Sequence, residues 1–222
     1  YLASEGDPLP EEPLRLAITL CGPRKHAHWS EDSTEVMDFF DMKGVLGALF
    51  EHLHLEGYRF ENTTHPSFHP GKCARIMLGD TQVGVTGELH PIVKEQYDLG
   101  PHPFIAAELS LDLILSSASS SIAIKSVKAF PPVLEDLAIV VDEATTAEQV
   151  EQVIRKAADE LLEGLTLCDV YRGEQIGAEQ KSLAFALTYQ AADRTLTDEE
   201  VGEIRQKVIR ELEKVLDAQL RA

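Results

Sequence analysis

Three histidines and a cysteine in the first half of the chain are the residues best suited to bind a metal ion. His65, His69 and Cys73 are spaced four residues apart, and His90 follows downstream. This spacing would stack ligands on one face of a helix, but the prolines and the glycine of "HPSFHPGKCA" forbid a helix there. In a loop, these side chains could still gather around zinc. A metal-dependent hydrolase built on this segment is therefore one hypothesis, and the zinc content of the purified protein tests it.

Glu88 and His90 share one face of a predicted strand end, in the arrangement of an acid/base pair. A catalytic site would also need a nucleophile or a glycine loop that holds phosphate, and neither lies nearby in the sequence. We therefore interpret "GELHP" as a strand end that makes turn hydrogen bonds. We predict no catalytic residue in this chain.

Positively charged and aromatic side chains gather around two predicted strands of the second half. Such cations could contact phosphates, which position RNA without reading its sequence, and bases could stack on Tyr171 if its ring turns outward. The alternative is that the cations pair with carboxylates such as Glu174, Glu179 and Asp193, because exposed ion pairs are common and weak. The predicted RNA-binding residues are Lys128, Tyr171, Arg172, Lys181, Ser182 and Arg194, and Lys125 enters the domain beside them.

The elements that must position these residues follow a regular order. The first predicted strand is followed by a helix that Thr145 or Thr146 caps. The third predicted strand is followed by a second helix, where Thr197 and Glu200 form a capping box. The final "AQLRA" could add a short edge strand. The order βαββα(β) predicts a ferredoxin-like domain with two helices on one face of its sheet. Its first three strands are "DLAIVV", "LTLCDVYRG" and "KSLAFALTYQ".

This predicted sheet leaves its other face uncovered. In "SLAFALTY" the large residues share one face and should pack on the helices, while the small residues from Ser182 to Thr188 face the other way. In "DLAIVV", Ala138 and its neighbours two positions away also point outward. A flat face of small side chains either binds a ligand or is covered by another domain. Cys168, in an apolar strand, is predicted to lie beside the core.

The first half predicts a mostly antiparallel sheet with one substantial helix. "LRLAITLCG" and "YRF" are predicted strands, and "CARIMLGDTQVGVTGEL" is a hairpin that turns at Gly79 and Asp80. Apolar residues at helical spacing in "DFFDMKGVLGALFEHL" predict the helix, and a short helix should follow Pro91. The apolar run "FIAAELSLDLIL" closes this half as a strand. We predict a first domain over 1–115, a serine-rich linker over 116–122 and a second domain over 123–222.

Composition limits the classes of function. The 222 residues are 44% hydrophobic and carry a net charge of −18, with no uncharged apolar window long enough to span a membrane. The chain through residue 121 has 8 Lys and Arg against 18 Asp and Glu, and the remainder has 12 against 20. Neither part shows the basic footprint of a strong non-specific nucleic-acid binder. Three widely spaced cysteines favour a reducing cytoplasm over a disulfide framework. The start lacks Met and a secretory signal, so we expect a piece of a larger protein.

Several motifs in one order resemble a known family. "FPPVLEDLAIVVDE", "LTLCDVYRGEQIG", "KSLAFALTYQ" and "DRTLTDEEV" resemble the ferredoxin-fold anticodon-binding domain that ends the β chain of bacterial phenylalanyl-tRNA synthetases. "DFFDMKG", "HPGKCA", "VGVTGELHP" and "AAELSLDLIL" resemble the end of that chain's catalytic-like domain. The resemblance implies an α+β protein, with an antiparallel class II synthetase-like module followed by the ferredoxin-like βαββαβ domain.

The resemblance also implies a function. The family's enzyme joins phenylalanine to tRNA-Phe with ATP and magnesium as an (αβ)₂ assembly whose α chain holds the aminoacylation site. This piece would need no cofactor, support assembly with the α chain and bind the anticodon stem-loop, and the "HPG" segment would be a structural turn without a metal. Relatives often carry basic residues near the positions of Glu135, Ala186 and Gln190, which here are not basic.

Two further hypotheses come from other classes of protein. Small-molecule regulatory modules of the ACT type share the βαββαβ order and often carry a glycine at the first strand–helix turn, whereas this turn reads "DEATTA". Alternatively, the chain is purely an assembly scaffold whose open sheet never touches RNA.

Overall fold

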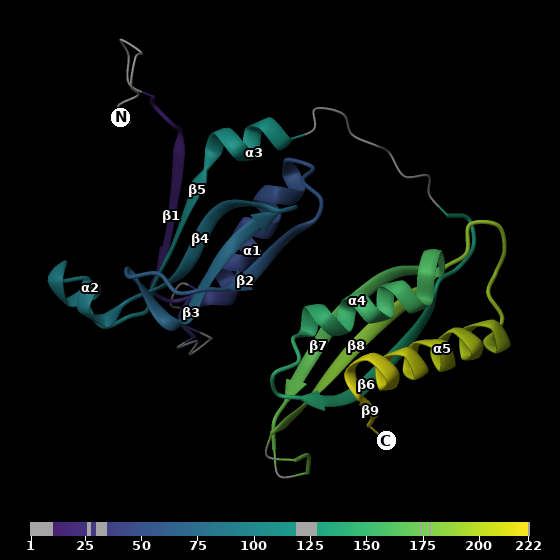
Figure 1. Ribbon diagram of the computed structural model, residues 1–222. Helices are drawn as coiled ribbons and strands as arrows, with labels where there is room; N and C mark the ends of the chain where they lie inside the picture. The colour runs from purple at the N-terminus through teal and green to yellow at the C-terminus, as the bar shows by residue number, and fades with distance from the viewer. Residues whose placement is uncertain are drawn as a thin grey trace. The chain divides into compact units, whose positions relative to one another are not determined.

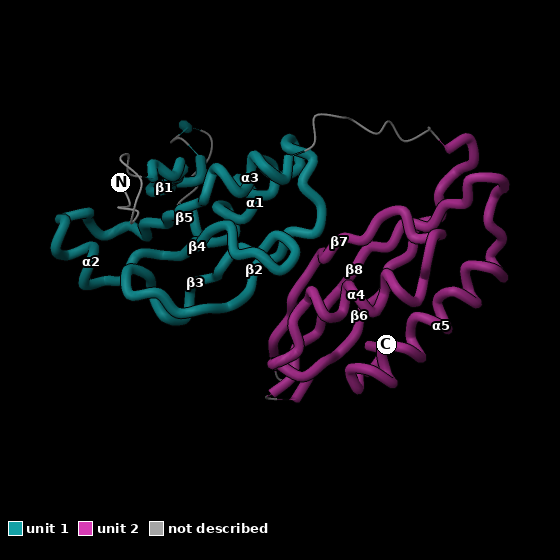
Figure 2. The backbone as a smooth tube through the Cα atoms, turned by 45° about the horizontal axis from the view of Figure 1, so that its top comes forward, with its two compact units in different colours: residues 1–124 teal, residues 125–222 magenta. Residues whose placement is uncertain are grey.

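The structure is a computed structural model that describes residues 11–25, 28–29, 35–118, 128–173, 175–177 and 179–221 (Figure 1). The chain divides into two compact units, residues 1–124 and 125–222 (Figure 2). Each has its own hydrophobic core. No helix among the described residues is long and apolar enough to cross a membrane. Lys125 and most of the predicted linker lie outside the described residues.

Unit 1 contains a five-stranded antiparallel sheet in the order β1-β5-β4-β3-β2. The predicted hairpin is confirmed, since two residues, Gly79 and Asp80, join β3 to β4. The short helix after Pro91 is also confirmed. The strands are β1 (Arg15–Cys21), β2 (Tyr58–Asn62), β3 (Phe68–Leu78), β4 (Thr81–Leu89) and β5 (Phe104–Ser110), and the helices are α1 (Phe39–His52), α2 (Pro91–Gln96) and α3 (Leu111–Ser117).

The core of unit 1 lies between α1 and the sheet (Figure 1). Asp38 caps α1, and its carboxylate accepts hydrogen bonds from the backbone of Phe40 and Asp41. Leu46 and Phe50 are at most 1% exposed and pack with apolar residues from the strands. The helical stripe predicted from the sequence therefore faces the sheet.

The end of the apolar run after Phe104 differs from the prediction of a continuous strand. β5 ends at Ser110, and the following "LDLILSS" forms α3. Ile114 is fully buried in the core of unit 1, and the Asp112 carboxylate accepts a hydrogen bond from the backbone of Leu14. Tertiary packing of Ile114 thus overrides the strand-like alternation of this run.

Unit 2 has the predicted βαββαβ order, with its four strands arranged as β7-β8-β6-β9 and all neighbours antiparallel. Both helices cover the same face of the sheet (Figure 1). The predicted edge strand at the C-terminus is confirmed as β9. The elements are β6 (Val133–Asp142), α4 (Ala147–Ala158), a 3₁₀ turn (Asp159–Leu161), β7 (Leu162–Tyr171), β8 (Gln180–Tyr189), α5 (Asp198–Leu216) and β9 (Gln219–Leu220).

Both helices of unit 2 begin at capping boxes. Thr146 caps α4 with Gln149 as its partner, and Thr197 caps α5 with Glu200. In each box the threonine hydroxyl accepts from the backbone three residues on, and the partner side chain accepts from the threonine backbone. These caps fix the residues at which α4 and α5 begin.

Candidate nucleic-acid interface

The side chains of β8 alternate between two different environments. Leu183, Phe185, Leu187 and Tyr189 are each at most 2% exposed and pack in the core beneath the helices. The alternate residues point to the opposite face, where no helix lies (Figure 1). On β6, Ala138 pairs with Ala184 and Asp136 pairs with Ala186, which extends this surface of small side chains. We call the surface the open face.

Tyr171, Ser182 and Arg221 meet at one end of the open face. Tyr171 of β7 lies directly opposite Ser182 of β8 in the ladder. The Arg221 guanidinium carbon is 4.8 Å from the centroid of the Tyr171 ring, within the range of a cation–π contact. An Arg221 Nη1 donates to Ser182 Oγ at 3.3 Å. The Tyr171 ring is thus on the open face, with Arg221 resting on it.

Arg221 was not among the residues predicted from the sequence. Its backbone N–H donates to the carbonyl of Ala138 at 2.9 Å, directly after the short pairing of β9 with β6. That pairing carries the guanidinium across the sheet toward β8. The expected edge strand "AQLRA" contained the signal, because alternation from Leu220 places Arg221 on the open face.

Arg172 and Lys181 both bind Glu143 at the same end of the sheet. The Arg172 Nη2 is 2.7 Å from one Glu143 carboxylate oxygen, and its Nε is 3.0 Å from the other. The Lys181 ammonium donates to the Glu143 backbone carbonyl at 2.8 Å, and the side chain is largely buried. The Arg172 hydrogen bond lowers the pKa of Glu143. Both predicted RNA-binding cations, Arg172 and Lys181, therefore already form hydrogen bonds with Glu143.

Lys128 and Arg194 lie toward the other end of β8. The strand from Ser182 to Tyr189 extends about 23 Å, so the six predicted residues form two groups. Lys128 contacts the Glu163 carboxylate and donates to the Gln190 carbonyl at 3.1 Å. Arg194 pairs with Glu200 at 2.8 Å and with Asp193 at 3.1 Å. The predicted pairing of Arg194 with Asp193 is present.

Cys168 was predicted to lie beside the core, and this prediction is wrong. The side chain is exposed. The ladder between β7 and β8 shifts register between Leu167 and Asp169, which takes Cys168 out of the regular alternation. The same bulge places Asp169 opposite Ala184, on the open face.

The histidines that suggested a metal site make local backbone contacts. The Nδ1 atoms of His65, His69 and His90 accept hydrogen bonds from backbone N–H groups two residues further on. Across the described ranges, no group of three or more His, Cys, Asp or Glu side chains could hold a metal ion. Glu88 forms an ion pair with Lys72 at 2.5 Å. "GELHP" therefore ends β4 and begins α2, as the turn interpretation predicts.

Comparison with known proteins accounts for both units. Residues 1–111 match the family described as the phenylalanyl tRNA synthetase beta chain CLM domain, and residues 129–221 match the ferredoxin-fold anticodon binding domain. The chain belongs to the phenylalanyl-tRNA synthetase β-chain family. The predicted family, the ferredoxin-like fold and the antiparallel α+β architecture are confirmed, and the match to an anticodon-binding domain does not favour the ACT-type alternative.

Individual β-chain relatives match over the same range. The phenylalanine–tRNA ligase beta subunit of Symbiobacterium thermophilum is 40% identical over 222 residues, covering all of this chain and 25% of that protein. The Clostridium acetobutylicum subunit is 41% identical over 186 residues, covering 83% of this chain and 23% of its own length. The Clostridium tetani subunit is 35% identical over all of this chain and 26% of its own length. The chain thus spans about a quarter of these β subunits.

The structure shows the contacts made at the three positions where β-chain relatives are expected to be basic. Glu135 pairs with Arg205 at 3.6 Å. Ala186 lies on the open face opposite Asp136. The Gln190 side-chain amide donates to the Phe130 carbonyl at 2.5 Å. Without a cation at Ala186, the charged side chains near the centre of the open face are the carboxylates of Asp136 and Asp169.

Proposed function

We propose that this chain is the C-terminal part of the β subunit of a phenylalanine–tRNA ligase, and that its open face binds the anticodon stem-loop of tRNA-Phe. The observation that carries the proposal is the Tyr171–Ser182–Arg221 cluster at the end of a flat, helix-free sheet surface. Single-stranded loops are recognised through bases that stack on aromatic rings or arginine planes and form hydrogen bonds at their edges. This cluster offers both kinds of contact.

The small side chains support this function sterically. Residues such as Ala138 and Ala184 let an RNA loop approach the sheet without displacing protein atoms. An unstacked base would lie against the Tyr171–Arg221 pair, and Arg221 would supply donors to a base edge or a phosphate. Asp169, two residues before Tyr171 on the same face, would accept hydrogen bonds from base amino groups.

We assign the remaining activities to the whole enzyme. Unit 1 would support assembly with the α chain in an (αβ)₂ complex, and two exposed leucines, Leu14 at 55% and Leu115 at 51%, support an interface there. Aminoacylation with ATP and magnesium would take place at the α chain, in the cytoplasm. We assign the magnesium, like the ATP, to the whole enzyme.

The test of RNA binding uses a fluorescent tRNA-Phe anticodon stem-loop and an unrelated stem-loop, each titrated with the 222-residue chain at two salt concentrations. We expect preference for the first, weakened by salt. Tyr171→Leu should weaken binding by ~1–3 kcal/mol, the usual contribution of one stacked base. Arg221→Gln should also weaken it.

Arg155→Gln is the matched control, because Arg155 is exposed on α4, which covers the opposite face of the sheet. Equal losses from Arg155→Gln and Arg221→Gln would contradict the assignment to the open face. A chain that binds neither stem-loop would favour the scaffold alternative. Titration of the complete αβ enzyme with the same variants would then decide between the two.

A further inference from the structure

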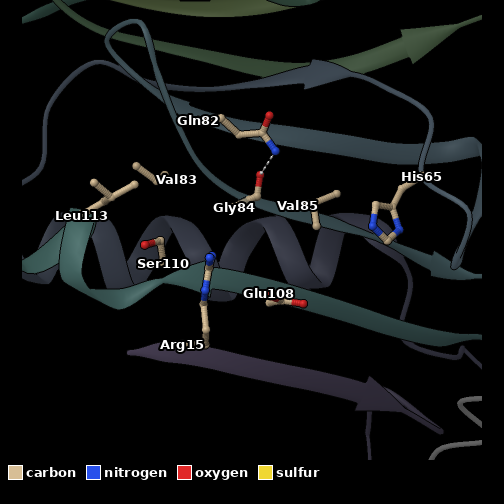
Figure 3. A pocket seen from close by; sticks show the side chains of 9 residues that line it. All are labelled: Arg15, His65, Gln82, Val83, Gly84, Val85, Glu108, Ser110 and Leu113. Carbon is tan, nitrogen blue, oxygen red and sulfur yellow. Dashed lines mark hydrogen bonds between the residues drawn. The ribbon is translucent and has the colours of Figure 1, made fainter. Parts of the chain in front are cut away.

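Unit 1 contains a pocket of about 320 Å³, whereas the candidate nucleic-acid interface belongs to unit 2 (Figure 3). Its walls come from β1, β4, β5, the first turn of α3 and His65, which precedes β3. Arg15 enters from β1, Glu108 and Ser110 lie on β5, and Val85 and Leu113 add apolar surface. A volume of this size accommodates a small metabolite.

A β-bulge in β4 builds one wall of this pocket. Ile76 pairs with Gly84 but Met77 pairs with Gln82, which leaves Val83 as the extra residue. A Cβ atom on Gly84 would lie 2.6 Å from the Glu108 carbonyl oxygen, so only glycine fits against β5 here. The Gln82 amide donates to the Gly84 carbonyl at 3.4 Å (Figure 3).

Two opposite charges in the pocket remain without a partner. Arg24, Lys72 and Arg75 in the same unit each hold a carboxylate. By contrast, neither Arg15 nor Glu108 forms an ion pair with any residue that the structure describes. The two side chains extend from neighbouring strands in different directions (Figure 3).

Ser110 is a third group without a partner. The residue is 8% exposed and occupies the N-cap position of α3, yet its side chain makes no capping hydrogen bond. Its hydroxyl makes no hydrogen bond to the described part of the protein and lines the pocket. No fully buried side-chain polar atom among the described residues lacks a hydrogen-bond partner, so the Ser110 hydroxyl is accessible from the pocket. A ligand in the pocket would provide its hydrogen-bond partner.

We propose that this pocket binds a small zwitterion with an apolar arm, the chemistry of a free α-amino acid. Arg15 lies directly opposite Ser110 in the ladder, so both can donate to one carboxylate. Glu108 lies two residues along β5, about 7 Å away, where its carboxylate accepts from the ammonium group. Val85 and Leu113 contact the apolar arm.

The charges in the pocket select against other classes of ligand. One cation and one anion line the pocket and leave it near neutrality, so a phosphate or nucleotide would be repelled by Glu108 and a polyamine by Arg15. A ligand that carries both charges a short distance apart satisfies both side chains. The proposal concerns unit 1 alone and does not depend on RNA binding.

The experiment titrates the 222-residue chain with L-valine, L-leucine and L-phenylalanine in separate calorimetric or ligand-observed NMR measurements. The matched probes are N-acetyl-L-leucine, which lacks the ammonium, and L-leucine methyl ester, which lacks the carboxylate. We expect saturable binding of at least one amino acid and at least about tenfold weaker binding of the probe that lacks either charge. Arg15→Gln and Glu108→Gln should each raise the dissociation constant about tenfold, as loss of a charged hydrogen bond does.

Arg75→Gln is the control variant, because Arg75 lies in the same sheet and binds Glu61 outside the pocket. All three positions are exposed, and circular dichroism confirms that each variant is folded. The proposal is overturned if none of the three amino acids binds saturably. It is also overturned if the acetylated or esterified probe binds as well as L-leucine, or if Arg75→Gln weakens binding as much as Arg15→Gln.

Discussion

Glu143 controls the positive charge at the Tyr171 end of the open face. Its carboxylate holds Arg172 with two hydrogen bonds, and its backbone carbonyl holds the Lys181 ammonium. An RNA phosphate that approaches Arg172 must compete with this carboxylate. In the proposed interface, Glu143 would therefore reduce phosphate binding at this end of the sheet and leave discrimination to the Tyr171–Arg221 pair.

Replacing Glu143 by glutamine should strengthen RNA binding. The Glu143→Gln variant frees the Arg172 guanidinium and removes one negative charge, so anticodon stem-loop affinity should rise at low salt. One added phosphate contact would steepen the dependence of log K on log salt by ~0.7–0.9. Anisotropy titrations over a salt series measure both effects. Glu203→Gln on α5 removes the same charge without freeing Arg172, and an equal gain from it would rule out this explanation.

Tyr189 is expected to make the free energy of unfolding decrease at alkaline pH. Burial, with a further contribution from the charge of Glu135, raises the pKa of Tyr189 to about 12. The unfolded chain loses this proton near pH 10, whereas the folded chain keeps it. The stability that the protonated Tyr189 contributes is therefore fully present below pH 10 and is lost as the pH rises from 10 to 12.

Tyr189→Phe should remove this part of the alkaline destabilisation. The shift of about 2 pH units corresponds to ~2–3 kcal/mol of unfolding free energy. Urea unfolding at pH 8, 10 and 11.5 should show the parent chain losing more stability than Tyr189→Phe. Tyr97→Phe changes an exposed tyrosine, 72% accessible, and should follow the parent chain. If the unfolding free energies of the parent chain and Tyr189→Phe fell equally with pH, the expected contribution of Tyr189 would be contradicted.

At the scale of elements, two glycines of unit 1 have opposite roles. Gly44 lies within α1, and a Cβ there would meet no atom within 4 Å. Gly84 lies in β4, where a Cβ would lie 2.6 Å from both the Glu108 carbonyl oxygen and Leu109 Cδ2. The helix tolerates a side chain at Gly44, whereas the contact between β4 and β5 requires none at Gly84.

Alanine substitutions should therefore change stability in opposite directions. Gly44→Ala should raise the unfolding free energy by ~0.5–1 kcal/mol, because alanine restricts the unfolded chain and favours the helix. Gly84→Ala should lower it by ~1–3 kcal/mol through overpacking. Chemical denaturation measures the change in unfolding free energy of each variant. A change of the same sign in both would refute the packing at Gly84.

At the scale of the whole molecule, the two units have separate cores. The buried cluster of unit 1 contains residues such as Leu46 and Ile105, and that of unit 2 contains Phe185 and Val208. The clusters share no residue. Each unit should therefore unfold with its own transition.

Core truncation should affect one unit at a time. Phe185→Ala should lower the stability of unit 2 by ~3–5 kcal/mol and Leu46→Ala that of unit 1 by ~2–5 kcal/mol. Scanning calorimetry should show one transition moving in each variant while the other stays in place. A single transition that moves as a whole in both variants would show instead that the units unfold together.

Local signals in the sequence were sufficient for most elements. Thr197 with Glu200, the alternation around Phe185 and the Gly79–Asp80 turn each depend on residues close together in the chain, so these predictions are confirmed. α3 was missed because its alternating run is stabilised as a helix by burial of Ile114. Cys168 was misplaced because the prediction relied on its apolar neighbours, whereas Leu167 faces the core and the next residue therefore points away from it. The bulge then changes the face of the residues that follow, and single-strand alternation contains no information on bulges.

The sequence by itself determined the family, the order of the elements and the flat face of small side chains that includes Ser182. The sequence left the face of Tyr171 open, and the register shift between Leu167 and Asp169 places Tyr171 opposite Ser182. Only the tertiary structure decided which charges are available. Glu143 meets Arg172 from 29 residues away, and Arg221 reaches Ser182 from 39 residues away through β9. Such pairings arise when strands distant in the chain become neighbours in a sheet. No local pattern encodes them, because they depend on register and edge pairing across the whole domain.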